Sequence, residues 1–523
     1  RHHAEPDQLL HHVPGLNCPS LRCMRKHWGW GGVDRALTPE QIAAAAPGIV
    51  DHLGFGRLDP EEPVPLERAM IPPPRLQPGD LAQIARTDNH ARATHALGKA
   101  YRDIVRGFRG DFGNAPDFVA LPETENDVEQ ILEWCADQNA AVIPYGGGTS
   151  VVGGIEPRAL DAYNGVVSLD LSRLDRVLEV DQVSRSALVQ AGAPGPRLQE
   201  QLKPHGLTSR FFPQSFEFST VGGWIATRAG GHFASGPTHI DDMAESVRAI
   251  TPSGAWESRR LPASGAGPSP DRMLLGSEGT LGVITQAWLR VMAEPTHRAR
   301  ATLRVPNFTA GCDAIRSVLQ SGLQPSNCRL IEGLEAPGSD DRPLLILGFE
   351  GGVDVNSQLQ AALGLCDGEL QDSGAAQWRD GFLEAPYLRD TLISLGILAE
   401  TFETAVTWDR LETLHANVTD SVPALIEAVR AVVRGRVTCR LTHAYPDGAA
   451  PYFTVLMPVE RGAEVETWDR IKRSVSDALL ANGGTITHHH AVGRDHVPWY
   501  QQQRPALFGN VLRAAKDAVD PGR

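Results

Sequence analysis

Three glycine-bearing loops in one stretch of the chain limit what it can fold into more than any other feature of the sequence. They read PYGGGTS (144–150), STVGGWIATRAGG (219–231) and GSEGTLGVI (276–284). Because a glycine in an ordered segment costs roughly 0.5–1 kcal/mol relative to alanine, such runs indicate that something approaches the backbone closely. None of the three has the GxGxxG pattern opening a helix, which argues against a Rossmann nucleotide-binding unit.

The three loops offer bare backbone amides with serine and threonine hydroxyls beside them. Successive backbone N–H groups in a turn form a concave anion site, and without Cβ atoms in the way a pyrophosphate can come close. The alternative is that each loop is an ordinary tight turn. Three such loops in one domain favour the ligand site.

The sequence divides into regions of different character. With 523 residues the chain is long enough for two or three domains. From Pro116 short apolar strands alternate with helices, of which residues 123–138 are an amphipathic example, and after Pro295 the alternation continues without comparable glycine loops. We predict a disordered extension over 1–23, a helical region over 24–110, the loop-bearing domain over 111–295, a cap domain over 296–495, and a C-terminal segment over 496–523 that returns to the loop-bearing domain.

Composition disfavours several classes of function. Hydrophobic residues make up 41% and charged residues 21% of the chain, as in a globular protein, and the net charge of −14 disfavours a nucleic-acid partner, which needs a basic face. No run approaches the roughly 18 apolar residues of a membrane-spanning helix, and no secretory signal is visible. We expect a cytoplasmic protein, for which a peripheral contact with the inner face of a membrane stays open.

Cysteine and histidine spacing gives no sign of a metal centre. The seven cysteines are scattered without CxxC spacing, which argues against a disulfide framework or a zinc ribbon and favours a reducing compartment. The first 23 residues do gather potential ligands, but their spacing matches no standard site. These potential ligands are His2, His3, His11, His12, Cys18 and Cys23. We therefore predict no bound metal.

Two stretches resemble the FAD-binding flavoproteins related to vanillyl-alcohol oxidase. PDFVALPETENDVEQIL followed by IPYGGGTSVVGG is similar to the opening segment of that family, in which the glycine loop cradles the FAD pyrophosphate, and GSEGTLGVIT is similar to its third FAD segment. The resemblance spans about residues 115–295. It implies an α+β fold, with a two-subdomain FAD-binding domain and a cap of antiparallel sheet with flanking helices.

Further stretches resemble one branch of that superfamily, the alkyldihydroxyacetonephosphate synthases. They are FEFSTVGGWIATRAGG (216–231), ETFETAVTWDR (400–410), ANGGTITHHHAVG (481–493) and HWGWGG near the start. The resemblance implies FAD chemistry without net redox change. A long-chain alcohol replaces the acyl group of acyl-dihydroxyacetone phosphate, with the flavin N5 atom acting as a nucleophile on C1 and forming a covalent adduct. It also implies a homodimer.

The resemblance assigns the cofactor site to the three loops and their surroundings. Ser219 and Thr220 are expected to add hydroxyl donors, Arg228 to lie beside the diphosphate or the pyrimidine end, and Glu278 to have a structural or adenosine-side role. The full predicted set is Pro144, Tyr145, Gly146, Gly147, Gly148, Thr149, Ser150, Gln214, Ser219, Thr220, Gly223, Thr227, Arg228, Glu278, Gly279, Gly282 and Ile284.

Three adjacent histidines and a tyrosine are the catalytic candidates. His488, His489 and His490 fall in a strand-like run, where alternation would put His488 and His490 on one face. A neutral histidine can relay a proton near neutral pH, and the family likeness favours that role, with His490 slightly ahead. A metal pair or a tag-like surface tract is the alternative. Tyr452 matches a family tyrosine near flavin and substrate; the alternative is a core tyrosine.

Two arginines are the candidates for substrate binding. Arg329 and Arg389 match family arginines, and a phosphate-bearing substrate suits the bidentate guanidinium fork. Each alone could equally be a surface ion-pair residue. The sequence also departs from the family: Phe211 stands where a histidine is usual and Gln214 where an aspartate is usual. This departure leaves the true substrate open.

Two other functions are alternatives to the predicted synthase activity. The first is a flavin dehydrogenase acting on a 2-hydroxy acid such as lactate or glycolate, and the second is a catalytically silent flavin-binding protein. Relatives with 2-hydroxy-acid activity typically show spaced histidines with a metal rather than three adjacent ones. The glycine loop holds no histidine that could link to the flavin, so we expect FAD to be bound noncovalently.

Overall fold

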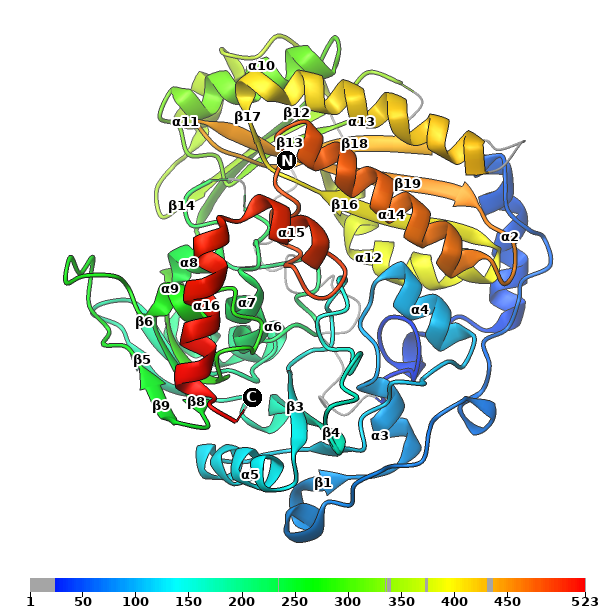
Figure 1. Ribbon diagram of the computed structural model, residues 1–523. Helices are drawn as coiled ribbons and strands as arrows, with labels where there is room; N and C mark the ends of the chain where they lie inside the picture. Colours follow the sequence, from blue (N-terminus) through cyan, green and yellow to red (C-terminus); the bar gives the residue numbers. More distant parts are fainter. Residues whose placement is uncertain are drawn as a thin grey trace.

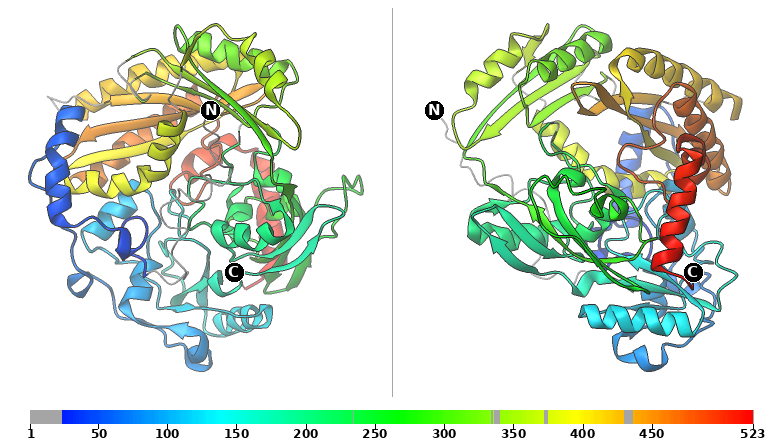
Figure 2. Two further views of the ribbon diagram at one scale, coloured as in Figure 1. Left: turned by 180° about the vertical axis from the view of Figure 1, so that it is seen from behind. Right: turned by 60° about the vertical axis from the view of Figure 1, so that its left-hand side comes forward.

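The structure is a computed structural model (Figure 1). It describes residues 24–522 except 234, 334, 336–339, 372–374 and 430–435. The extension predicted over 1–23 therefore lies outside the described residues. Figures 1 and 2 show the large sheet of the C-terminal half lying over the domain that carries the glycine loops.

A small, mainly parallel sheet begins the loop-bearing domain. Its order is β1-β2-β4-β3, with β1 antiparallel at the edge. The strands are β1 (Ala85–Arg86), β2 (Phe118–Ala120), β3 (Ala140–Tyr145) and β4 (Gly165–Asp170). Helix α5 (Glu125–Asp137) connects β2 to β3, and a capping box between Thr124 and Asp127 fixes its start. The first glycine loop begins where β3 ends.

A second, antiparallel sheet completes this domain, in the order β5-β6-β10-β8-β9. Helix α7 (Val221–Thr227) lies within the second glycine loop, and Trp224 and Ile225 bury it against the same core. The third loop leads into β10. The strands are β5 (Val177–Asp181), β6 (Ser186–Gln190), β8 (Ala244–Thr251), β9 (Gly254–Glu257) and β10 (Val283–Arg290).

Short elements fill the edges of the loop-bearing domain. They are α6 (Gly195–Leu202), β7 (Leu207–Thr208), α8 (Ile240–Met243), α9 (Asp271–Leu274) and β11 (Met292–Ala293), of which β7 pairs with β11. The C-terminal helix α16 (Ala506–Val519) packs back on this domain through Leu512 and Ala515, as Figure 2 shows from two sides.

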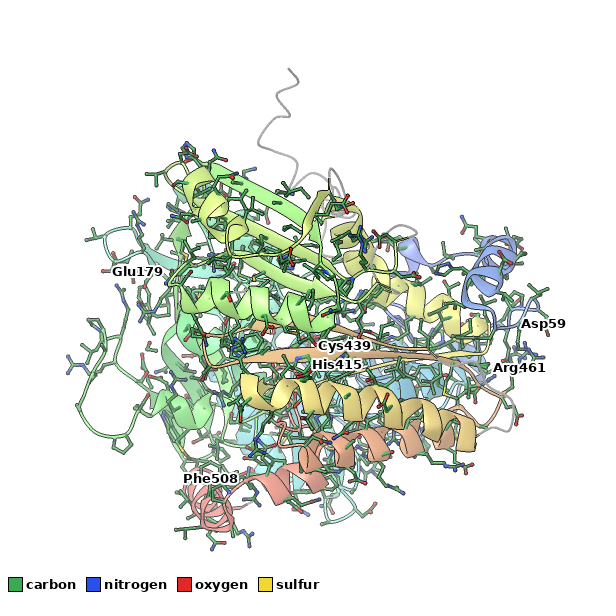
Figure 3. The ribbon with its side chains drawn as sticks, turned by 90° about the horizontal axis from the view of Figure 1, so that it is seen from above. Asp59, Glu179, His415, Cys439, Arg461 and Phe508 are labelled. Carbon is green, nitrogen blue, oxygen red and sulfur yellow. The ribbon has the colours of Figure 1, made fainter. Side chains whose placement is uncertain are left out.

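An eight-stranded antiparallel sheet forms the C-terminal half. Its order is β15-β12-β14-β13-β18-β19-β16, with β17 paired to β19. The strands are β12 (His297–Arg304), β13 (Asn327–Ile331), β14 (Leu344–Gly351), β15 (Glu369–Gln371), β16 (Ile397–Glu403), β17 (Val406–Thr407), β18 (Arg436–Ala444) and β19 (Gly448–Pro458). The helices on its outer face are α10 (Phe308–Gln320), α11 (Asn356–Leu363), α13 (Trp408–Val429) and α14 (Glu464–Ala481). Figure 3 shows α10, α13 and α14 lying over this sheet.

Strand β19 shows how this sheet serves two purposes. Phe453, Val455 and Met457 belong to the core under the helices, whereas Tyr452 and Thr454, on the other face, line a cavity. This alternation with a period of two is what a strand dictates. The inner face of the sheet is therefore free to contribute polar side chains to a site.

Helices from distant parts of the chain flank one end of the sheet. Helix α2 (Pro39–Leu53) packs on the end of α12 (Ala375–Ser394) and on β16, through Leu53, Leu392 and Ile397. Helices α3 (Asn89–Thr94) and α4 (Tyr101–Phe108) lie next to the first glycine loop, and α15 (Val497–Gln503) leads to α16. Among the described residues, no helix is long and apolar enough to cross a membrane.

Candidate active site

One cavity of about 520 Å³ lies between the loop-bearing domain and the inner face of the large sheet. Its volume falls in the usual range for a ligand site. The lining comes from the three glycine loops, from β16, β18 and β19, from α12, and from His489 and His490. Segments far apart in the sequence thus share one space.

The three glycine loops pack directly on one another. A Cβ atom on Gly147 would lie 2.0 Å from the carbonyl oxygen of Phe218, directly before the second loop, and 2.8 Å from Ser219 Cα within it. Gly279, in the third loop, has φ +79°, and a Cβ there would lie 2.9 Å from the ring of Pro144. The close approach that the sequence indicated is therefore made in part by the protein itself. These glycines keep the loop backbones close enough to form one wall of the cavity.

The structure brings nearly all predicted cofactor residues into this cavity. The residues that line it are Pro144, Tyr145, Gly146, Gly147, Gly148, Thr149, Ser150, Gln214, Ser219, Thr220, Gly223, Thr227, Glu278, Gly279, Gly282 and Ile284. Arg228 does not line it. Its side chain is 59% exposed, and its Nη2 atom donates to Asp241 Oδ2 at 2.7 Å. The αL conformation at the end of α7 (φ +51°) accompanies this outward placement. A place for Arg228 beside the cofactor stays a prediction.

Phe211 lies in the core and not in the cavity. Its side chain is 1% exposed, and its ring centroid is 5.0 Å from that of Trp224. Where the family resemblance calls for a histidine, this chain thus buries an aromatic ring. Gln214, three residues on, does line the cavity.

Glu278 connects the third glycine loop to the segment after the histidines. It is largely buried, and its carboxylate accepts from the backbone N–H groups of Val492 at 3.0 Å and Gly493 at 2.8 Å. Burial raises the pKa of this carboxyl, and the two hydrogen bonds offset only part of that rise. Glu278 thereby holds the C-terminal segment against the loop-bearing domain.

The strand predicted over His488–His490 is wrong, because the segment is an irregular turn. Glu403, at the end of β16, accounts for this turn. The Glu403 carboxylate accepts from the backbone N–H groups of His488 (2.6 Å), His489 (3.1 Å) and His490 (3.0 Å). It also accepts from the Thr487 hydroxyl at 2.6 Å. One carboxylate thus folds the three histidines around itself, and they do not alternate between two faces.

Burial sets the protonation states of this group. It lowers the pKa of His488 and His489 to about 3 and that of His490 to about 4, against the attraction of Glu403. Burial alone would raise the pKa of Glu403, but the histidines beside it and the Thr487 hydroxyl hold that pKa well below its usual range. The site therefore contains an ionised carboxylate and neutral imidazoles at pH 7.

Tyr452 stands beside the histidines on the inner face of the sheet. Its ring centroid lies 6.2 Å from that of His489 and 5.7 Å from that of His490. The guanidinium carbon of Arg440 lies 4.1 Å from the centre of the tyrosine ring, a cation–π arrangement, and Arg440 pairs with Glu335. Burial raises the pKa of Tyr452, so its hydroxyl keeps its proton.

Arg329 and Arg389, the predicted substrate residues, both line the cavity. Arg329 is 2% exposed, and its Nη2 atom donates to the carbonyl oxygen of His232 at 2.7 Å. Burial lowers its pKa to about 9, which leaves it charged at neutral pH. Arg389 lies on α12, where the next residue, Asp390, accepts from the backbone N–H of Trp30 at 2.8 Å and from Lys26. The N-terminal segment thus anchors the helix that carries Arg389.

Four further polar residues at the site were not predicted from the sequence. Tyr445 and His239 both approach His488 Nε2, at 2.7 Å and 3.1 Å. His443 Nε2 donates to the Gly231 carbonyl at 2.7 Å. His239 is far in sequence from His443 and Tyr445, and a lone histidine carries little sequence signal. Glu403 was visible only as the second acid of an alternating strand, ILAETFE, where a buried charge calls for a partner.

The cavity has an apolar arm between α2 and α12. Leu53, Leu392 and Leu456 line it, with Ala385, Pro386, Leu388 and Ala399. Leu388 is 48% exposed, so this arm reaches the surface. An apolar arm that joins a polar site to the surface suits a substrate with a long hydrocarbon chain.

Comparisons with known proteins agree with the geometry. A family described as "FAD binding domain" matches residues 116–258, and one described as "FAD linked oxidases, C-terminal domain" matches residues 294–523. An alkyldihydroxyacetonephosphate synthase of Dictyostelium discoideum is 30% identical over 89% of this chain and 82% of its own. That of Trypanosoma brucei brucei is 29% identical over 86% of this chain and 80% of its own.

The chain belongs to the alkyldihydroxyacetonephosphate synthase-like family of FAD-linked oxidases. A solved alkyldihydroxyacetonephosphate synthase covers 95% of this chain and 97% of its own with a TM-score of 0.80 and 26% identity. p-Cresol methylhydroxylase, with a TM-score of 0.63, shares the fold at 12% identity over 84% of this chain and 92% of its own. The predicted α+β fold of the vanillyl-alcohol oxidase type is confirmed, and the protein is an FAD-dependent enzyme.

The residues of the family's cofactor site fit FAD. One wall of the cavity is backbone from three glycine loops, in which Gly147 and Gly279 have no room for a Cβ. Thr149, Ser150 and Thr227 lie along the same wall, and of these the Thr227 hydroxyl donates to the Gly223 carbonyl at 2.8 Å. Backbone amides and hydroxyls are the donors that a diphosphate needs. Pro144–Ser150 and Gly279–Ile284 would therefore hold the cofactor.

Proposed function

We propose that the protein exchanges the acyl group of acyl-dihydroxyacetone phosphate for a long-chain alcohol, forming alkyl-dihydroxyacetone phosphate for ether-lipid synthesis. One observation carries the proposal: a single cavity joins the glycine-loop wall, a cluster of arginine, histidine and tyrosine side chains, and an apolar arm open at the surface. In this exchange the C1–carboxylate bond breaks and a C1–alkoxy bond forms. The alcohol proton leaves with the fatty acid, so no electrons are gained or lost.

The arginines would bind the phosphate of the substrate. Arg329 and Arg389 line the same cavity, and the first is buried and charged at neutral pH. A hydrogen bond to a charged group is worth about 1.5–3 kcal/mol, more where the guanidinium binds two oxygens at once. Although the chain has a net charge of −14, these cations make the local electrostatic potential more positive, which attracts an anionic substrate.

The histidine segment would take up and return the protons of the exchange. The neutral rings of His489 and His490 face the cavity and can each accept a proton. Their Nδ1 atoms lie 3.6 Å from oxygen atoms of Glu403, so the buried carboxylate would stabilise the imidazolium formed. Tyr452 would orient the reacting oxygen with its protonated hydroxyl. When bound, the flavin supplies the nucleophilic N5 atom.

The apolar arm would hold the acyl and alkyl chains. Its opening lies between α2 and α12, beside the exposed Leu388. We propose that substrates enter there from a membrane surface with which the protein makes peripheral contact on its cytoplasmic side. We also propose noncovalent FAD and a homodimer, as in the family resemblance. Acid precipitation that releases all the flavin into the supernatant would support noncovalent binding.

A direct test mixes the FAD-loaded protein with acyl-dihydroxyacetone phosphate and labelled hexadecanol. We expect labelled alkyl product and free fatty acid in equal amounts, with the flavin absorbance unchanged during turnover. Prompt bleaching of the flavin by lactate or glycolate, without exchange, would instead support a 2-hydroxy-acid dehydrogenase. A D-lactate dehydrogenase of Arabidopsis thaliana, 33% identical over 42% of this chain and 38% of its own, makes that control worthwhile.

A matched pair of variants tests the phosphate site. Arg389→Met removes the cavity-lining guanidinium, so KM for the phosphorylated substrate should rise about tenfold to a hundredfold. Arg316→Met, on exposed α10 beside Asp313, should leave it unchanged. An equal effect of both variants would contradict the assignment.

A further inference from the structure

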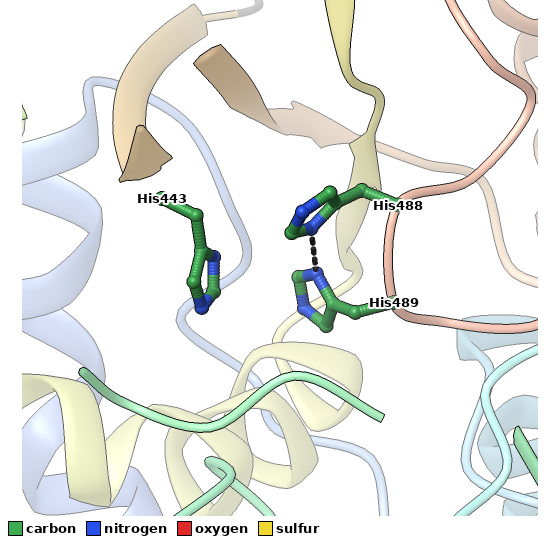
Figure 4. A group of neighbouring side chains, drawn as sticks. All are labelled: His443, His488 and His489. Atoms are coloured by element: carbon green, nitrogen blue, oxygen red, sulfur yellow. Dashed lines mark hydrogen bonds between the residues drawn. The ribbon is translucent and has the colours of Figure 1, made fainter. Parts of the chain in front are cut away.

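Four histidines and a tyrosine meet beside the cavity, in an arrangement that the proposed reaction does not use in full. One ring nitrogen from each of His443, His488 and His489 lies within 4.8 Å of the others. Figure 4 shows the three rings facing a common space. His239 and Tyr445 stand behind His488. His443 comes from β18, and His488 and His489 come from the segment that Glu403 folds.

The spacing of two of the rings matches metal coordination. The Nδ1 atoms of His488 and His489 are 3.1 Å apart. Two imidazole nitrogens on one tetrahedral Zn²⁺, each at about 2.0–2.1 Å, stand about 3.3 Å apart. The pair therefore needs to move by only a few tenths of an ångström to share an ion.

The second nitrogens of two of these rings already have the partners that metal-bound histidines require. His443 Nε2 donates to the Gly231 carbonyl at 2.7 Å, which leaves the lone pair on Nδ1. The Thr442 hydroxyl now lies 3.1 Å from that Nδ1 atom, and a bound ion would take its place. His488 Nε2 lies 2.7 Å from the Tyr445 hydroxyl. A ligating imidazole almost always places its other N–H on such a partner, which fixes the tautomer and the ring orientation. The cluster is thus oriented before any ion arrives.

The surroundings also suit a divalent cation. Glu403 is buried, and an oxygen of its carboxylate lies 3.6 Å from His489 Nδ1, so it would offset much of the positive charge. His443 and His489 both line the cavity, so a fourth coordination position would open toward the substrate. Three protein ligands with an open position are typical of catalytic zinc sites rather than structural ones.

We propose that His443, His488 and His489 form a binding site for Zn²⁺ or a similar divalent transition metal. Neutral imidazoles select such ions over Mg²⁺ or Ca²⁺. The proposal goes beyond the proposed exchange reaction, and it reverses the expectation of a metal-free protein drawn from the sequence. With the ion bound, His488 and His489 give up their lone pairs, and His490 remains as the proton acceptor among the three.

Binding of Co²⁺ and Zn²⁺ to the full chain tests the proposal without any activity assay. The FAD-loaded protein is treated with chelator and desalted. Co²⁺ should then give the intense visible bands of a tetrahedral site, and Zn²⁺ should bleach them at one equivalent per chain. His443→Gln and His488→Gln should each weaken Zn²⁺ binding by at least about a hundredfold, since even the partners of ligating residues are worth tenfold to a hundredfold.

Two controls make the outcome decisive. His297→Gln alters an exposed histidine of β12 and should leave the affinity unchanged. A variant with the N-terminal histidines replaced by glutamine should keep the cobalt bands; these are His2, His3, His11 and His12. Retained FAD absorbance shows that each variant is folded. Cobalt bands that survive both His443→Gln and His488→Gln, or that never appear, would overturn the site, whatever the exchange assay gives.

Discussion

The two ends of the cavity are built in opposite ways. At the glycine-loop end the wall is backbone, and side chains are removed so that three loops can touch. At the histidine end the wall is side chains from β13, β18, β19 and α12 together with His489 and His490, and one buried carboxylate, that of Glu403, fixes the segment that carries these histidines. A group bound by backbone leaves a local pattern in the sequence. A site made of converging side chains depends on long-range folding and leaves only scattered residues.

The largest effect should come from placing a side chain in the backbone wall. In Gly147→Ala the new Cβ would lie 2.0 Å from the Phe218 carbonyl and 2.8 Å from the Ser219 Cα. Neither atom belongs to a flexible side chain, so the loops must separate. We expect purified Gly147→Ala to lack flavin absorbance and all activity. Gly352→Ala, whose Cβ would meet nothing within 4 Å, should bind FAD normally. Full flavin content in Gly147→Ala would break the contrast between the two ends.

The histidine end should show the converse, a loss of chemistry without loss of cofactor. In Glu403→Gln the amide NH₂ faces donors that the carboxylate now satisfies, and no charge remains to stabilise an imidazolium. Because acid–base catalysis contributes about 10²–10⁴, we expect kcat to fall by at least about a hundredfold with the flavin retained. Steady-state exchange kinetics and the flavin spectrum measure the two quantities separately.

Glu179→Gln is the matched control for that carboxylate. Glu179 is exposed on β5, at the edge of the molecule in Figure 3, and its variant should behave as the unmodified protein. Normal turnover by Glu403→Gln would show that the carboxylate only shapes the segment. Joint loss of flavin and activity would show that the two ends cannot be perturbed independently.

The same contrast explains what could be predicted from the sequence. The glycine loops and the cofactor wall could be predicted from the sequence. Gly147 and Gly279 allow loop backbones to touch, and the glycine runs that this requires are visible as a local sequence pattern. The histidine strand was wrong because its conformation depends on Glu403, far away in the sequence. His239, His443 and Tyr445 were missed for the same reason: each is unremarkable alone, and only the fold brings them together. Arg228 follows the loop motif yet turns outward to Asp241.

A buried acid beside the first glycine loop should make stability depend on pH. Asp103, on α4, lies beside Gly98, whose Cβ would touch the Ser150 carbonyl of the first loop. Burial, with Asp495 and Glu156 nearby, raises the pKa of Asp103 to about 7. The positive charges of Arg102 and Arg106 offset part of that rise. Since this pKa exceeds that of the unfolded chain, ionising Asp103 destabilises the fold as pH rises from about 4 to 7.

Asp103→Asn keeps the acceptor and removes that cost. Its gain in free energy of unfolding over the unmodified protein should be larger at pH 8 than at pH 5 by on the order of 2 kcal/mol, since each pKa unit is worth about 1.4 kcal/mol. Urea unfolding at the two pH values measures this. Asp469→Asn removes a 44% exposed partner of Arg102 and should show no such pH dependence. An equal gain at both pH values would mean that Asp103 is not titrating in this range.

The smallest effect should appear in the apolar arm, which belongs to neither end. Leu392, on α12, is 5% exposed and lines the arm, so Leu392→Phe should shorten it. One or two methylene groups in an apolar pocket are worth about 1–3 kcal/mol. We expect kcat/KM to fall about tenfold for hexadecanol and to stay unchanged for octanol. Leu507→Phe, on a 74% exposed position of α16, should alter neither. Equal losses for both alcohols would place the hydrocarbon chain elsewhere and leave this arm without a role in chain binding.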